Sequence, residues 1–141
     1  PSYAEGGGAP AQGALMAATF IAEPSNERRA AFLASYARKF NVRKIPVPMA
    51  AAQAYDATYI LLYSMFNIRN GDLNGPALKA ALENMQRTYY GVVATYERPF
   101  SVDDKDAITP NMMVMGLVKN GAVTFAYPED AKRNLFVQRK K

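Results

Sequence analysis

The sequence predicts an α/β fold with three main helices, a short strand and a C-terminal β-hairpin. Three observations predict it. The apolar run at residues 14–21 has the length of a buried strand. Three segments between residues 25 and 85 combine a helix-start signal with apolar residues at three- and four-residue spacing. Asn120-Gly121 separates two apolar runs, which is the strongest short-range signal of a hairpin.

The composition excludes several kinds of functional site. The chain has 141 residues, enough for one ordinary domain, and half of them are apolar. It contains no histidine and no cysteine, which excludes a Ser-His-Asp site, a Cys-His site, a disulfide and a thiolate metal site within it. An enzyme would then have to rely on carboxylates, Lys or Tyr. Our interpretation of the whole sequence is a binding protein and not an enzyme, with no catalytic residue, no metal and no cofactor. The chain begins at Pro1 rather than Met, which indicates a processed chain or a piece of a longer one.

The net charge is +5, and part of it lies in a C-terminal segment at Lys132, Arg133, Arg139, Lys140 and Lys141. We interpret this segment as a solvated terminus, although a basic segment also suits nucleic acid or acidic lipid. The apolar run from Tyr59 to Phe66 is too short to span a bilayer, which needs about 20 apolar residues.

The N-terminal part reads as loop, strand and helix. Residues 1–12 are rich in Gly, Ala and Pro and predict a loop or linker. The uninterrupted run 14–21 is typical of a strand buried on both faces, as in a parallel sheet. Ser25 or Asn26 then caps a helix that runs to about Phe40. Its basic residues are expected to face solvent: Arg28, Arg29, Arg38 and Lys39.

The second helix is predicted from Met49 to Ile68, because Pro46 and Pro48 oppose a helix before Met49 and Asn70-Gly71 ends it. It is apolar on much of its circumference, so we expect it to be covered on more than one side. Its predicted apolar stripe consists of Ala52, Tyr55, Tyr59, Leu62 and Phe66.

The third helix begins at Asn74-Gly75-Pro76, with Pro76 in the first turn, where its missing N–H costs nothing. Its predicted buried stripe is Leu78, Ala81, Leu82 and Met85. Residues 89–96 predict a strand, 103–109 a polar loop, and the runs 112–118 and 122–127 the final hairpin.

The best candidate ligand-binding residues are Met49, Ala50 and Gln53, in the first turn of the second helix. A helix N-terminus carries about half a positive charge and free N–H groups, so it suits a carboxylate or amide. The small residues allow close approach, and Met49 offers an adaptable wall. The alternative is that an Ala-rich turn serves close helix packing alone.

Two neighbouring motifs have structural interpretations. We expect Tyr55 to lie in the core and Asp56 to accept structural hydrogen bonds, the alternative being that Asp56 orients a cleft loop. Asp103, Asp104 and Asp106 lack the spacing of a calcium loop and predict a solvated hinge loop.

The order of these motifs resembles a known family. The motifs are Tyr55-Asp56-Ala57, Gly91-Val92, the acidic loop and the Asn120-Gly121 hairpin. Over residues 10–127 the chain resembles the C-terminal portion of the type I periplasmic solute-binding proteins, in the branched-chain amino-acid receptor branch of ABC importers. Whole members are more than twice as long.

The resemblance implies a C-terminal fragment of a two-lobed fold. Residues 1–22 correspond to a strand segment of the second lobe, 23–101 to a helical return into the first lobe, 102–127 to a hairpin of the second lobe, and 128–141 to a basic tail. Hinge crossings are implied near Glu23-Pro24 and near Phe100–Asp104.

The implied function is binding of a small amino-acid-like, amide or aromatic-acid ligand between two lobes, in the periplasm or anchored outside the cytoplasm. The implied partners are ABC permease subunits and the remainder of the receptor upstream of Pro1, with no nucleic acid. A homodimer of the isolated fragment is also expected, because its apolar faces need partners. Two alternatives stay open: a receptor-like ligand-sensing domain, and a small basic protein that binds nucleic acid or a membrane surface.

Overall fold

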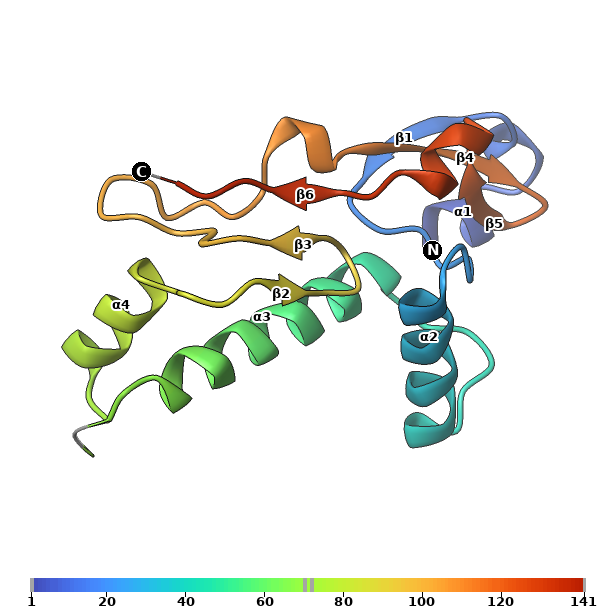
Figure 1. Ribbon diagram of the computed structural model, residues 1–141. Helices are drawn as coiled ribbons and strands as arrows, with labels where there is room; N and C mark the ends of the chain where they lie inside the picture. Colours follow the sequence, from blue (N-terminus) through green and yellow to red (C-terminus); the bar gives the residue numbers. More distant parts are fainter. Residues whose placement is uncertain (1, 70, 72, 141) are drawn as a thin grey trace. The chain divides into compact units, whose positions relative to one another are not determined.

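The computed structural model describes residues 2–69, 71 and 73–140, and it confirms the α/β class (Figure 1). The chain forms two compact units, each assembled from separate stretches. Unit 1 comprises residues 1–52 and 113–133, and unit 2 comprises residues 53–112 and 134–141. The chain therefore passes from one unit to the other three times, after residues 52, 112 and 133.

Unit 1 contains a three-stranded antiparallel sheet of β1 (Leu15–Ala18), β4 (Val114–Lys119) and β5 (Ala122–Phe125), in the order β1-β4-β5. The predicted hairpin is confirmed. Asn120 (φ 51°) and Gly121 (φ 72°) both adopt the left-handed backbone that a two-residue hairpin loop requires. The 3₁₀ turn η3 (Pro128–Lys132) follows the sheet.

The prediction for residues 14–21 was wrong about the sheet. Among the described residues, β1 pairs with β4 alone and in antiparallel register, from Leu15 opposite Leu117 to Ala18 opposite Val114. Leu15 and Met16 are exposed, and within the strand only Ala18 is buried. An apolar run does not reveal whether the described chain supplies a second neighbouring strand.

The predicted N-terminal loop contains two short helical turns, α1 (Ser2–Gly6) and η1 (Ala9–Ala11). The Gly7 N–H donates to the Tyr3 carbonyl at 2.9 Å and closes the first turn. Ala4 and Ala11 pack with Val118 in a small buried cluster, which explains why this Gly- and Ala-rich segment is ordered against the sheet.

The first long helix, α2, spans Glu27–Phe40 and is capped as predicted at Asn26, whose side chain accepts a hydrogen bond from the Arg29 N–H at 2.9 Å. Arg29 corrects the expectation of a solvent-facing residue, because it is only 3% exposed. Its guanidinium donates to the Ser25 hydroxyl at 2.7 Å. Phe32 is also buried and meets Phe20 edge to face, with ring centroids 5.8 Å apart.

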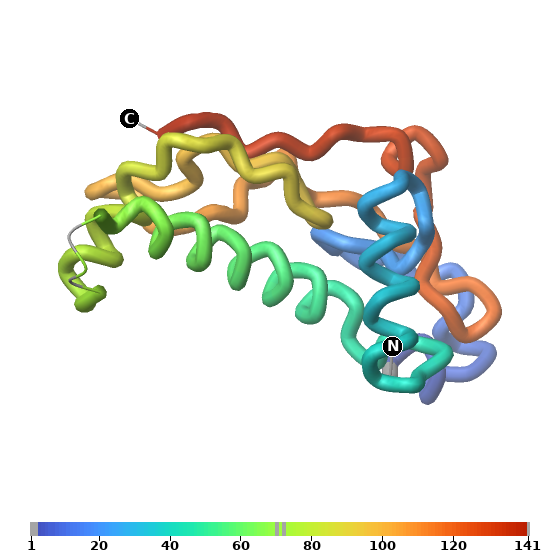
Figure 2. The backbone as a smooth tube through the Cα atoms, turned by 60° about the horizontal axis from the view of Figure 1, so that its bottom comes forward, coloured from blue at the N-terminus to red at the C-terminus, as the bar shows by residue number. Residues whose placement is uncertain are grey.

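Unit 2 is built on α3 (Pro48–Phe66), whose first residues belong to unit 1. α4 (Gly75–Glu83) follows and begins where predicted. Asn74 caps it, because its side chain accepts from the Ala77 N–H at 2.9 Å. The sheet of this unit has the order β2-β3-β6, from β2 (Tyr89–Tyr90), β3 (Thr95–Tyr96) and β6 (Phe136–Val137). Figures 1 and 2 both show α3 running alongside this sheet. The 3₁₀ turn η2 (Pro110–Met112) completes the unit.

Two predictions are corrected in unit 2, one for residues 89–96 and one for the C-terminal segment. Residues 89–96 form two antiparallel strands joined by a tight turn rather than one strand, and the Gly91 N–H donates to the Ala94 carbonyl at 2.9 Å within that turn. The C-terminal segment was predicted as a solvated terminus. Its Lys132, Arg133 and Arg139 are exposed, but part of the segment joins the core. Leu135 and Val137 are buried, Val137 completely, and β6 pairs in parallel with β3. Lys141 lies outside the described residues.

The buried side of α3 also differs from the prediction. Every fourth residue is buried, at Ala52, Asp56, Ile60 and Ser64. By contrast, Tyr55, Tyr59, Leu62 and Phe66 are between 38% and 78% exposed. Within the described residues, α3 is thus covered along a polar-containing stripe, and its aromatic stripe faces outward. The helix also begins one residue earlier and ends two residues sooner than expected, and Asn70 of the predicted stop lies outside the described residues.

In the part of the chain that the structure describes, none of the helices combines the length and apolarity that crossing a membrane requires.

Candidate functional site

The N-terminal end of α3 presents backbone donors at the protein surface. Pro48 opens the helix and has no N–H, and the Ala51 N–H makes the first intrahelical bond, to the Val47 carbonyl at 3.0 Å. The N–H groups of Met49 and Ala50 precede that bond, so the helix itself supplies no acceptor for them. Both residues are exposed. This end of α3 therefore offers a partial positive charge to a small polar group.

Met49 lines a cavity of about 230 Å³ in unit 1. The walls come from β1 and the segment after it, from the loop before α3, and from the β4–β5 turn. They are almost entirely apolar, and Lys44 is the one charged residue among them. The lining residues are Ala4, Met16, Ala17, Ala18, Phe20, Ile21, Ala22, Lys44, Val47, Pro48, Met49, Gly121, Ala122 and Val123.

Lys44 forms an ion pair with Glu5, with the Lys44 Nζ 2.6 Å from the Glu5 Oε1. The same ammonium donates to the Gly121 carbonyl at 3.4 Å. The hydrogen bond and the positive charge of Lys44 lower the pKa of Glu5, which keeps this carboxyl ionised. An apolar cavity beside one cation and one anion can hold the body of a small molecule and orient its polar end.

The structure does not bring the three predicted site residues into one cavity. Met49 lines the cavity of unit 1, as described. Gln53 lines a different cavity of about 360 Å³ in unit 2, together with Ile60 and Tyr96. Ala50 is exposed and is among the lining residues of neither.

Sequence reasoning missed Glu5 and Lys44. They are 39 residues apart, and no spacing rule links a residue of a Gly-rich segment to a loop lysine. The one available signal was the charge of Glu5 itself, placed immediately before Gly6-Gly7-Gly8.

Asp56 lies at the centre of a buried hydrogen-bond cluster in unit 2, which confirms its interpretation as a structural acceptor. Its Oδ1 accepts from the Val92 N–H at 2.7 Å and its Oδ2 from the Val93 N–H at 2.8 Å. The hydroxyls of Tyr96 (3.1 Å) and Tyr89 (3.4 Å) donate to the same carboxylate. Asp56 thus fixes the tight turn between β2 and β3.

The electrostatics of this cluster follow from its burial. Burial raises the pKa of Asp56, and its hydrogen bonds to Val92, Val93 and Tyr96 act in the opposite direction. Burial, reinforced by the nearby Asp56 carboxylate, also holds the pKa of Tyr89 and Tyr96 well above the ordinary tyrosine range. The tyrosines therefore stay neutral and act as donors. The expectation that Tyr55 lies in the core was wrong, since its ring is exposed.

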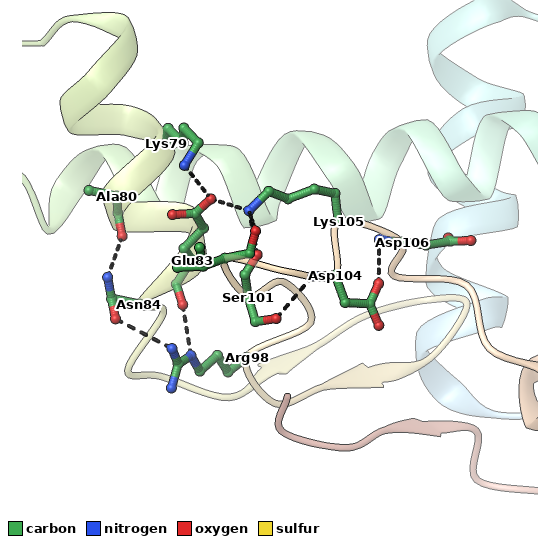
Figure 3. A network of polar contacts seen from close by, with 10 residues as sticks. Lys79, Ala80, Glu83, Asn84, Arg98, Ser101, Asp104, Lys105 and Asp106 are labelled. Carbon is green, nitrogen blue, oxygen red and sulfur yellow. Dashed lines mark hydrogen bonds and ion pairs between the residues drawn. The ribbon is translucent and has the colours of Figure 1, made fainter. Parts of the chain in front are cut away.

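The acidic loop after β3 is tied to the end of α4 by a second polar network (Figure 3). The Glu83 carboxylate pairs with Lys79, at 2.7 Å, and with Lys105. Lys105 also donates to the carbonyls of Ser101 and Val102. These two lysines lower the pKa of Glu83, with Lys105 contributing most.

Asp104 and Asp106 take part in the internal geometry of the same loop. The Asp104 N–H donates to the Ser101 hydroxyl at 3.2 Å, and the Asp106 N–H donates to Asp104 Oδ1 at 3.0 Å. Lys140 pairs with Asp104 at 2.6 Å. Among the residues that the structure describes, no group of three or more acidic, histidine or cysteine side chains is placed to hold a metal ion.

Comparison with known proteins gives the family and the fold of this chain. A sequence model of the family described as "Periplasmic binding protein" matches residues 1–122. The fold is similar to that of a solute-binding protein of an ABC transporter from R. palustris, solved in complex with benzoate. The TM-score is 0.63 and the sequence identity 17%, and the match covers 88% of this chain but 32% of that one. The chain thus spans about a third of that protein's length. No curated protein matches the sequence.

Proposed function

Because this chain belongs to the type I periplasmic binding protein family, we propose that it contributes to the solute-binding component of an ABC importer. In this proposal the chain forms the C-terminal part of a receptor outside the cytoplasm. The receptor holds a small ligand between two lobes and delivers it to the permease subunits. Its action is binding and not catalysis.

The observation that carries the proposal is the cavity of unit 1 beside the start of α3. Its walls are apolar, and both Met49 and the Lys44 of the Glu5–Lys44 ion pair line it. The first-turn N–H groups of Met49 and Ala50 have no acceptor within the helix. A receptor for small solutes needs this combination, because apolar walls contribute affinity while a few polar groups set orientation. Gln53 lines the separate cavity of unit 2 and has no part in this proposed site.

These features favour a ligand with an apolar body and a carboxylate or amide end. The first-turn N–H groups and Lys44 suit the anionic or carbonyl end. Met16, Phe20 and Met49 suit the apolar body. The R. palustris protein binds benzoate, an aromatic acid and thus a compound of this class. Amino-acid-like ligands and small amides belong to the same proposal.

The proposed mechanism is closure of two lobes on the ligand. A ligand shifts a receptor toward its closed form only through contacts that the open form does not make. The N-terminal end of α3 would supply such contacts on one wall, and the closed form would then dock on the permease.

Isothermal titration calorimetry tests the proposal, using the protein at its natural length with benzoate, L-leucine and acetamide as probes. We expect at least one of them to bind with one-to-one stoichiometry. Ala50→Glu places a negative charge beside the proposed carboxylate position and should weaken binding of the carboxylate probes at least ~10-fold, about 1.4 kcal/mol. Glutamate in the first turn favours the helix, so the fold should persist.

Ala54→Glu is the matched control, because Ala54 is also exposed and lies one turn further along α3. It should leave binding unchanged. Absence of binding for every probe, or equal loss in both variants, would contradict the proposal.

A further inference from the structure

The cation beside the unit 1 cavity is already paired with an anion of the protein. Among the described residues that line this cavity, Lys44 is the one that carries a charge, and its ammonium lies 2.6 Å from the Glu5 Oε1. Glu5 itself is not one of the lining residues. The group that a ligand carboxylate would approach therefore holds a carboxylate of the chain before any ligand arrives.

The fold of unit 1 places the two charged side chains next to each other. Glu5 follows the buried Ala4 in α1. Lys44 precedes the buried Ile45 in the loop before α3. The Lys44 ammonium also donates to the Gly121 carbonyl in the β4–β5 turn, at 3.4 Å. Three separate segments of unit 1 therefore converge on one ammonium.

The ion pair is weak enough for a ligand to open it. The side chains of Lys44 and Glu5 are 52% and 55% exposed, and water screens pairs of this kind so strongly that many contribute little to stability. An ammonium has three N–H donors, of which Glu5 and the Gly121 carbonyl take two. A ligand carboxylate on the third donor would lie close to the Glu5 carboxylate, and like charges repel. Such a ligand must therefore displace Glu5 or bind beside it at a cost.

From this geometry we propose that Glu5 is a specificity-determining residue, which competes with a ligand carboxylate for Lys44 and thereby lowers the affinity of the cavity for anionic ligands but not for neutral ones. The inference rests on the proposed function, because it concerns the same cavity. Lys44 lowers the pKa of Glu5, so the competing group is charged at neutral pH. A neutral amide meets no such competition, since its carbonyl can accept the third Lys44 donor while the ion pair stays closed.

Isothermal titration calorimetry with benzoate and benzamide tests the inference on the protein at its natural length. The two probes share one apolar body and differ in the charge of the polar end. Glu5→Gln keeps the shape of the side chain and removes its charge. We expect this variant to bind benzoate about 3-fold more tightly than the wild type, a change of the size that exposed ion pairs contribute, and to bind benzamide equally well.

Further variants separate competition for Lys44 from a change in net charge. Glu129→Gln removes the same charge from an exposed position of unit 1 that does not line the cavity, so it should leave both affinities unchanged. Lys44→Met removes the cation and should weaken benzoate binding, and adding Glu5→Gln to it should bring no further change. Glu5→Ala makes the same comparison as Glu5→Gln if circular dichroism shows that the glutamine variant does not fold.

The outcomes distinguish this inference from the proposed function. A Glu5→Gln protein that binds benzoate no better than the wild type overturns the inference, and weaker binding would show that Glu5 positions Lys44 instead. Equal tightening of benzamide, or tightening of benzoate that persists in the Lys44→Met background, also overturns it. In each of these cases a probe binds and the proposed function stands. Absence of binding of both probes to every protein overturns the inference, and the proposed function fails with it if L-leucine and acetamide do not bind either.

Discussion

Replacing Asp56 by asparagine tests whether one carboxylate holds the β2–β3 turn to α3. The carboxylate accepts four hydrogen bonds, two of them from the backbone N–H groups of Val92 and Val93. An asparagine keeps one oxygen but turns an NH₂ group toward donors on the other side. A tyrosine hydroxyl can rotate and accept from that group, but a backbone N–H cannot.

The loss of stability can be worked out from the backbone N–H groups that are left without an acceptor. One buried N–H without an acceptor costs about 1–3 kcal/mol, and the remaining bonds lose the strengthening that an ionised acceptor gives. Removing a buried charge offsets part of this loss, because burial already disfavours the ionised form of Asp56. We expect Asp56→Asn to lower the free energy of unfolding by about 2–3 kcal/mol at pH 7. Asp56→Ala leaves both N–H groups unpaired and should cost about 4 kcal/mol.

Urea denaturation followed by far-ultraviolet circular dichroism and by tyrosine fluorescence measures both values. A thermal midpoint about 6–10 °C below the wild type is the corresponding shift for Asp56→Asn. Ala54→Asn, on the exposed side of the same helix, controls for the lower helix propensity of asparagine. An Asp56→Asn protein within about 0.5 kcal/mol of the control would refute the reasoning, as would an alanine variant more stable than the asparagine variant.

Three further predictions concern single contacts. Gly91→Ala should destabilise by about 2–4 kcal/mol in urea denaturation, because a Cβ there would lie 2.4 Å from the Asp56 Oδ2, whereas Gly75→Ala, with open space around its Cβ, should be neutral. Lys105→Met should destabilise at pH 7, and this loss should shrink as the pH falls below 4.5. The pKa of Glu83 is lowered in the folded state, so its contribution is present above its ordinary value of 4.5 and is lost as the pH falls through the folded-state pKa. A loss that does not change with pH would contradict this. Asn26→Ala should cost about 1 kcal/mol of thermal stability through loss of the α2 cap, and an unchanged melting curve would count against that role.

The features predicted correctly from the sequence are those that depend on neighbouring residues. The Asn120-Gly121 hairpin, the cap at Asn26 and the helix start at Asn74 each depend on residues within a few positions of one another, so one short window contains the whole interaction. The acceptor role of Asp56 was predicted too, but its partners were not, because Val92 and Val93 lie 36 and 37 residues away.

The errors have a shared physical cause. On α3, polarity predicts the wrong side: Asp56 and Ser64 are buried, while the tyrosines face outward. A helix that is apolar all round gives no contrast from which to choose an inner side. The run at 14–21 failed for a related reason, since apolar residues report a capacity for burial and not the strand that provides it. Met49 was proposed from helix-end chemistry, which one short window of sequence contains, whereas the pairing of Glu5 with Lys44 depends on the tertiary fold.

The parallel pairing of β6 with β3 determines when unit 2 can complete its fold during translation. Unit 2 starts at Gln53, yet it needs Leu135 and Val137 to cover the outer edge of its sheet. A ribosome that has made everything up to the β4–β5 hairpin has therefore supplied most of unit 2 without its last strand. Nascent chains arrested before residue 135 should still expose the β3 edge to chaperones and proteases, and protection should arrive only with the synthesis of β6.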